Sequence, residues 1–311
     1  MKRIKKIYSG VVVPMVTPFL KAGRIDPEGV NNIVNHLIGS GTHPFILGTT
    51  GESTSITQTE KLSLVKETVK AVNGRTTLYA GISGTCLREM IENAKQYAGE
   101  GVDVVVSTMP YYYPVDERQM KKLFTTLADS CPCPLIIYNI PSTTHLSIPL
   151  IVIDELSHHY NIVGLKDSEK SIERLAVAAS MWKDREDFSF LLGWASESMS
   201  AVKIGADGLV PSSGNLIPAI YKAIIDGVLE ENEQIAVRAQ ERANIVSSIY
   251  QKGRSLSHSI SAFKVMLSAY RLCETHVLPP FYQPSAEEQE NIKEEILKMY
   301  PSLNEINTLN L

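Results

Sequence analysis

The chain has 311 residues, of which 44% are hydrophobic and 21% charged, and its formal net charge is −4. These are the proportions of an ordinary globular protein, and the length fits one large α/β barrel with an extra segment, or two domains. Because the basic residues form no block and do not alternate with aromatic residues, we do not expect a nucleic-acid partner. We also expect no membrane partner, since no run approaches the roughly 20 apolar residues that a spanning helix needs.

The N-terminal segment superficially resembles a signal peptide, with basic residues at 2, 3, 5 and 6 before the apolar residues 11–13. The apolar run is short, is broken by Pro14 and has no small-residue cleavage site, so we do not assign a signal peptide. The four cysteines form no paired zinc spacing. We therefore expect a cytoplasmic protein with reduced cysteines.

The first two-thirds of the chain alternate between short, β-branched apolar runs and segments with helical spacing. In residues 27–38, for example, Val30, Ile33, Val34 and Leu37 share one helical face. This alternation predicts βαβ units and a parallel sheet. Eight such units favour a closed (β/α)8 TIM barrel over an open sheet. The eight predicted strands are residues 10–15, 44–48, 77–82, 102–108, 134–139, 162–167, 188–193 and 208–212.

After Pro218 the predicted elements are all helices, at residues 219–229, 232–251, 257–272 and 286–300. No long segment rich in proline, glycine or serine separates them from the strands. We therefore expect residues 1–216 to form the barrel and residues 217–311 to form C-terminal helices packed on it.

Lys166 stands at the end of the predicted strand 162–167, which is otherwise apolar up to Asp167. A strand of this kind is covered on both faces, so the lysine loses solvation and its pKa falls. A neutral amine can attack a carbonyl group to form a Schiff base. From this strand alone, a lysine that reaches water or pairs with Asp167 is the commoner case. The other strand ends decide between the two.

In such a barrel the functional residues lie at the carboxyl ends of the strands. The second predicted strand ends in Gly48-Thr49-Thr50-Gly51, whose successive N–H groups and hydroxyls suit a carboxylate or a phosphate. The turn could equally be a helix cap.

Tyrosines follow two further strands. Residues 109–114 contain three, including Tyr112, and Tyr138 ends the fifth predicted strand. A tyrosine can transfer protons when it reaches the reacting group, although a single barrel tyrosine is more often a core aromatic. Together with Lys166 and the Thr49–Thr50 turn, they predict imine chemistry on a 2-keto acid.

The ordered set of motifs resembles the dihydrodipicolinate synthase/N-acetylneuraminate lyase family of pyruvate-dependent class I aldolases, over residues 8–300. Each motif is weak alone, and the order and spacing of the set carry the resemblance. The motifs are Val13-Pro14, Thr17-Pro18-Phe19, Gly48-Thr49-Thr50-Gly51-Glu52, Pro110-Tyr111-Tyr112, Tyr138-Asn139-Ile140-Pro141, Gly164-Leu165-Lys166-Asp167 and Gly205-Ala206-Asp207-Gly208.

The resemblance implies that Lys166 is the Schiff-base lysine and that Tyr138 transfers protons. It also implies that Thr49 and Thr50 bind the pyruvate carboxylate. Thr50 would link Tyr138 to a Tyr112 that comes from a neighbouring subunit.

At the acceptor end, the resemblance implies that Val210 and Ser212 line the site. Dihydrodipicolinate synthases carry an arginine for the acceptor carboxylate where this chain has Thr143, and a threonine cannot replace the bidentate fork. Sialic acid lyases carry an acidic pair where this chain has Ala195-Ser196.

Polar residues near the predicted strand ends could instead read the hydroxyls of a smaller sugar acid; they are Ser142, Thr143, His145, Ser168 and Ser196. We therefore predict a Schiff-base lyase that acts on pyruvate and a 2-keto acid, such as a 2-keto-3-deoxy sugar acid. The alternative is 4-hydroxy-tetrahydrodipicolinate synthase, which condenses pyruvate with aspartate semialdehyde. A second alternative is a ligand-binding barrel without catalysis, because fold does not fix function.

We expect no cofactor and no metal, since the seven histidines are scattered along the chain and a metal-dependent aldolase needs convergent ligands. If Tyr112 serves a neighbouring site, the protein is at least a dimer. Members of the resembled family are commonly dimers of dimers, so we expect a homotetramer.

Overall fold

Eight parallel strands close into a barrel in the computed structural model, which describes residues 6–309. Each strand pairs with the next one along the chain, and β8 returns to pair with β1, with Leu209 opposite Val11. The predicted TIM barrel is thus confirmed. The strands are β1 (Gly10–Pro14), β2 (His43–Ile46), β3 (Tyr79–Gly81), β4 (Val104–Thr108), β5 (Leu135–Asn139), β6 (Ile162–Asp167), β7 (Ser189–Leu192) and β8 (Gly208–Leu209).

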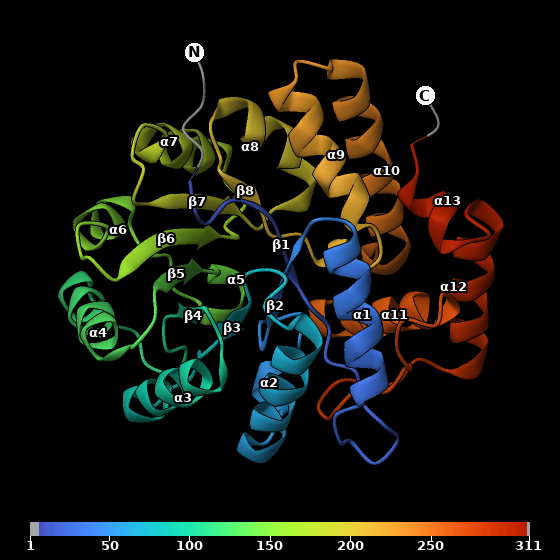
Figure 1. The fold of residues 1–311 in the computed structure, drawn as a ribbon, viewed down its shortest axis with the longest axis horizontal. Coiled ribbons are helices and arrows are strands. Elements are labelled where there is room, and N and C mark those ends of the chain that lie inside the picture. Colours follow the sequence, from blue (N-terminus) through green and yellow to red (C-terminus); the bar gives the residue numbers. More distant parts are fainter. Residues whose placement is uncertain (1–5, 310–311) are drawn as a thin grey trace.

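Helices alternate with the strands and surround them (Figure 1). Local sequence sets their starts: the Asp26 side chain accepts a hydrogen bond from the Glu28 N–H, and Pro27 occupies the first turn, a favoured place for proline. The helices that follow β1 to β7 are α1 (Pro27–Gly39), α2 (Gln58–Val72), α3 (Leu87–Glu100), α4 (Glu117–Ser130), α5 (Pro141–Thr144), α6 (Leu150–Leu156), α7 (Ile172–Trp182) and α8 (Ser198–Ile204), with 3-10 turns η1 (Ser53–Ser55) and η2 (Ala195–Glu197).

The last part of the chain is helical, as predicted. Helix α9 contacts β1, α10 packs along α9 and α8, and α11 to α13 lie on one side of the barrel in Figure 1. The division into residues 1–216 and 217–311 stays a prediction, and residues 1–5 of the basic N-terminal segment lie outside the described residues. The elements are η3 (Ser212–Asn215), α9 (Pro218–Leu229), α10 (Glu233–Gln251), α11 (Leu256–Ala269), α12 (Ala286–Met299) and α13 (Leu303–Asn307).

Two hydrophobic clusters hold these layers together. One fills the inside of the barrel and includes Phe45, Val106 and Leu191, while a larger one lies between the strands and the helices. Burial of this apolar surface is the main favourable contribution to folding. In residues 6–309, no helix is both long and apolar enough to cross a membrane.

Candidate active site

A cavity of about 850 Å3 opens at the carboxyl ends of the strands. Residues from β5, β6 and the loops after β2, β7 and β8 line it, together with residues of α10 and α11. Nine of the site residues singled out from the sequence line this cavity: Thr49, Thr50, Tyr138, Ser142, Lys166, Ser168, Ser196, Val210 and Ser212.

Lys166 and Tyr138 lie side by side at the ends of β6 and β5. They are paired in the register of these strands, and the Lys166 Nζ lies 3.7 Å from the centre of the Tyr138 ring. Only 4% of Lys166 and 5% of Tyr138 are exposed. Burial lowers the pKa of Lys166, and contact with Tyr138 opposes this shift. An amine that loses its proton readily, next to a phenol, is what imine formation with proton transfer needs.

Ser168 connects the loop after Lys166 to Tyr138. Its hydroxyl donates a hydrogen bond to the Tyr138 Oη over a long 3.4 Å. The side chain fits because residue 193 is a glycine: a Cβ at Gly193 would lie 2.1 Å from the Ser168 Oγ. Any other residue at 193 would therefore displace the Ser168 hydroxyl.

The turn after β2 presents Thr49 and Thr50 to the cavity. The turn is closed by two hydrogen bonds, which the N–H groups of Gly51 and Ser53 donate to the Gly48 carbonyl oxygen at 3.1 and 3.4 Å. Within residues 6–309, no protein group accepts a hydrogen bond from the backbone N–H of Thr49 or Thr50. These two donors are therefore available to a carboxylate in the cavity.

A buried polar network fixes the backbone that follows Lys166. Arg174 Nε donates to Asp167 Oδ2 at 2.6 Å, and Asn139 Nδ2 donates at 2.9 Å to both Asp167 Oδ1 and Glu169 Oε2. Burial raises the pKa of Asp167, and the charge of Arg174 acts in the opposite direction. Since these bonds anchor the residues on both sides of Ser168, they also fix the loop that leaves Lys166.

Three predicted site residues do not line the cavity of Lys166: Tyr112, Thr143 and His145. Tyr112 is 74% exposed and does not line the cavity of its own chain. Thr143 lines a neighbouring cavity of about 500 Å3, together with Tyr111 and residues of α11, and its hydroxyl donates to the Ile140 carbonyl at 3.3 Å. Thr49 and Tyr138 line this cavity too, so it adjoins the cavity of Lys166.

Helix α10 contributes polar residues that the sequence analysis missed, because this segment was assigned only as a helix packed on the barrel. The Ser212 Oγ and the Tyr250 Oη lie 2.7 Å apart in a hydrogen bond, and Gln251 Nε2 donates to the same Tyr250 Oη at 2.8 Å. The sequence does carry a signal for this contribution. Polar residues recur in α10 every three or four positions, and residues at that spacing share one face of a helix. The lining residues of α10 are Asn244, Ser247, Ser248, Tyr250 and Gln251.

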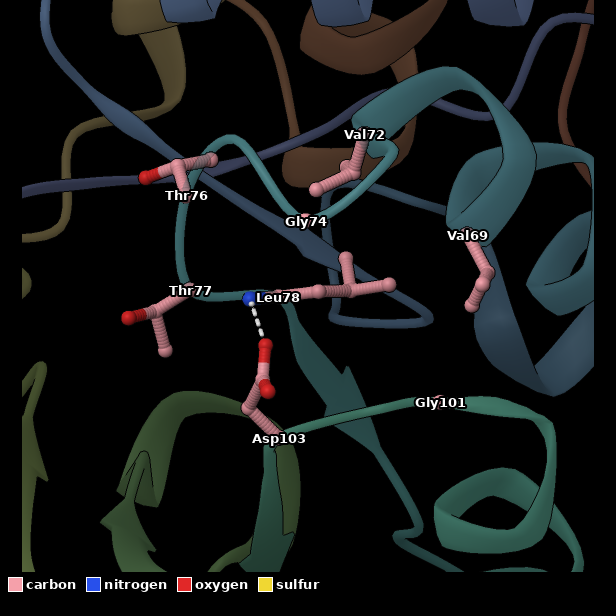
Figure 2. Close-up of a pocket in the computed structure, with 8 residues that line it drawn as sticks. All are labelled: Val69, Val72, Gly74, Thr76, Thr77, Leu78, Gly101 and Asp103. Atoms are coloured by element: carbon pink, nitrogen blue, oxygen red, sulfur yellow. Dashed lines mark hydrogen bonds between the residues drawn. The ribbon is translucent and has the colours of Figure 1, made fainter.

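A further cavity, of about 370 Å3, lies where the chain enters β3 and β4 (Figure 2). Among residues 6–309, Asp103 is the one titratable side chain that lines it, and its Oδ2 accepts a hydrogen bond from the Leu78 N–H at 2.8 Å. This end of a TIM barrel ordinarily serves stability, and none of the described residues that line the cavity carries an amine for imine chemistry.

The comparisons with known proteins agree with this geometry. The family model described as "Dihydrodipicolinate synthetase family" matches residues 7–299. A 4-hydroxy-tetrahydrodipicolinate synthase of Oceanobacillus iheyensis is 34% identical over 68% of this chain and 71% of its own length. A probable 2-dehydro-3-deoxy-D-pentonate aldolase of Escherichia coli is 26% identical over 92% and 96% of the two chains. The solved dihydrodipicolinate synthase of Bacteroides thetaiotaomicron superposes with a TM-score of 0.89 at 29% identity, over 94% of this chain and 99% of that one. The chain therefore belongs to the dihydrodipicolinate synthetase family of Schiff-base lyases and aldolases.

Proposed function

We propose that the protein is a class I aldolase that cleaves a 2-keto-3-deoxy sugar acid to pyruvate and an aldehyde. In this proposal the Lys166 amine attacks the C2 ketone, and loss of water leaves an imine. Tyr138 takes the proton of the C4 hydroxyl as the C3–C4 bond breaks, and the electron pair of that bond moves toward the imine nitrogen. The enamine left on Lys166 then takes a proton at C3, and water releases pyruvate.

The pyruvate end of the cavity supports this sequence of steps. The pKa of Lys166 is lowered by burial, its amine lies against Tyr138, and the N–H groups of Thr49 and Thr50 are available to the carboxylate. Because the chain belongs to a family of lyases, the alternative of a ligand-binding barrel without catalysis is not favoured.

The hydroxyl-rich wall of the same cavity is the observation that carries the substrate class. Side chains from the strand ends and from α10 present hydroxyl and amide groups, and several of them are already joined by hydrogen bonds. A site built from such groups selects substrates that carry matching hydroxyls. The probable 2-dehydro-3-deoxy-D-pentonate aldolase among the relatives agrees with this choice.

A second candidate is the condensation of pyruvate with aspartate semialdehyde, the alternative raised by the sequence. The arginine expected to bind the acceptor carboxylate is replaced by Thr143 in this chain. However, Lys252 and Arg254 line the same cavity as Lys166. Either cation would attract the acceptor carboxylate. The synthase name of the Oceanobacillus relative also favours this candidate.

We further propose that the protein works in the cytoplasm as a homo-oligomer, with pyruvate and an aldehyde as its small-molecule partners. The exposed Tyr112 supports the assembly, since a neighbouring chain would be needed to bring this phenol to a site. Proposed substrate contacts are Thr49, Thr50, Ser168, Val210 and Ser212.

A paired assay separates the two candidate reactions. Pyruvate release is measured from a panel of 2-keto-3-deoxy sugar acids, and condensation of pyruvate with aspartate semialdehyde is measured beside it. We expect efficient cleavage of at least one sugar acid, weak condensation, and neither reaction in Lys166→Ala. Efficient condensation without sugar-acid cleavage would overturn the aldolase proposal in favour of the synthase.

A further inference from the structure

A fully buried ion pair joins the turn that carries Thr49 and Thr50 to helix α11. Glu52 lies in this turn, and its Oε1 is 2.5 Å from the Nζ of Lys264; neither side chain is exposed. Lys264 Nζ also donates to the His276 carbonyl at 2.7 Å. The turn is thus tied to a helix that follows it far along the chain.

The backbone of Glu52 needs outside support. Its φ of 57° lies in the left-handed region, which is unfavourable for a residue with a Cβ and persists where the surroundings hold it. Both carboxylate oxygens of Glu52 have partners that hold this conformation in place. Oε1 pairs with Lys264, and Oε2 accepts a hydrogen bond from the Leu278 N–H at 3.0 Å.

Stability alone is a poor explanation for this pair. Removing two charges from water costs about as much as their attraction returns, so a buried ion pair stabilises little compared with apolar residues of similar size. Its position suggests another role. The part of α11 that precedes Lys264 lines the cavity through Leu256, Ser259 and Ile260, so the pair joins two walls of the same site.

We propose that Glu52 and Lys264 are positioning residues for the carboxylate of the 2-keto acid. They fix the N–H groups of Thr49 and Thr50 relative to Lys166, and they hold α11 against the cavity. Neither residue lines the cavity, so both act through the residues that do. This inference depends on the proposed function, in which Lys166 forms an imine with pyruvate.

The test measures how much pyruvate is needed to trap the imine. Each variant is incubated with a series of pyruvate concentrations and borohydride, and the reduced adduct on Lys166 is quantified by mass spectrometry. The double variant Glu52→Gln/Lys264→Met removes both charges, so no buried charge is left without its partner. Glu52→Asp keeps both charges but shortens the carboxylate, and it decides the test if the double variant does not fold.

We expect both variants to need on the order of 10- to 100-fold more pyruvate for half-maximal trapping, which is the effect of displacing binding groups by about 1 Å. The maximal adduct per folded chain should stay unchanged, because Lys166 is intact. A role in stability alone would not move the half-maximal concentration while leaving the maximum in place.

Glu233→Gln is the matched control. It breaks the ion pair of Lys203 Nζ and Glu233 Oε1, 2.6 Å apart, which joins α8 to α10 at the surface, and it should be trapped like the parent. A half-maximal concentration equal to that of the parent, in either folded variant, would overturn the positioning role. A parent chain that pyruvate and borohydride do not label at Lys166 would overturn the proposed function itself.

Discussion

Lys166 occupies a place where the folded chain favours a neutral side chain. It ends an otherwise apolar strand and is almost completely buried, so the protonated amine lacks the solvation that it has in the unfolded chain. In the proposed mechanism, the same desolvation prepares the amine for attack on a ketone. A lysine that loses solvation in this way reduces the stability of the folded chain, a cost that active-site groups commonly carry.

Replacing this lysine by an uncharged side chain of similar length should therefore stabilise the protein at neutral pH. The pKa of Lys166 in the folded chain lies below its ordinary value of 10.5. Between the two values the folded chain binds fewer protons than the unfolded one, so the parent's stability rises with pH and the cost disappears toward pH 10.5.

Urea unfolding at pH 7 and pH 10 checks this prediction. Lys166→Met should be more stable than the parent at pH 7, and the difference should shrink at pH 10. A parent that is at least as stable as Lys166→Met at pH 7 would show that another interaction stabilises the charged lysine.

At the scale of elements, the barrel could be predicted because buried parallel strands are apolar runs that end in glycine, proline or polar residues. Lys166 was detectable for the same reason, as a charge at the end of such a run. Strand ends were less certain: β8 stops at Leu209 instead of continuing to Ser212, since Pro211 has no N–H to donate.

Contacts between distant elements could not be predicted. The pairing of Glu52 with Lys264 and the contribution of α10 to the cavity depend on how the C-terminal helices pack on the barrel. No local pattern specifies which residues then meet. Periodicity shows that a helix has a polar stripe, and only the tertiary structure shows what the stripe faces.

The polar stripe of α10 leads to a prediction about substrate recognition. Tyr250→Phe keeps the stacking on Phe263, whose ring centre is 4.3 Å away, and removes only the hydroxyl that bonds to Ser212 and Gln251. We expect kcat/KM for the sugar acid to fall roughly 2- to 10-fold, since one neutral hydrogen bond contributes about 0.5–1.5 kcal/mol. Trapping of pyruvate on Lys166 should not change.

Tyr221→Phe is the control for this variant, because the Tyr221 hydroxyl is also buried and bonded to a serine, Ser213 at 2.7 Å, but does not line the cavity. Equal losses in the two variants would mean that the Tyr250 hydroxyl acts through stability and not through the substrate.

At the scale of the whole molecule, the exposed Tyr112 leads to a prediction about assembly. It is exposed and packs edge-on against Tyr113, with ring centres 4.9 Å apart. If its phenol completes the site of a neighbouring subunit, Tyr112→Phe on one chain and Lys166→Ala on the other damage the same site of a mixed dimer. One site of a mixed dimer then keeps both Lys166 and Tyr112.

Subunit mixing tests this arrangement. Tyr112→Phe and Lys166→Ala, each of low activity alone, should regain about a quarter of the parent's activity after equal mixing and reassembly, because half of the dimers are mixed and each has one of two sites intact. Activity that stays at the average of the two separate variants would place Tyr112 outside the shared site.

The most direct measurement for the whole account is the identity of the residue that pyruvate modifies. The protein is incubated with pyruvate and borohydride, digested, and the peptides are sequenced by mass spectrometry. We expect one reduced pyruvyl group on Lys166 and none on Lys166→Ala. An unmodified parent, or the same adduct in Lys166→Ala, would contradict imine formation at the end of β6.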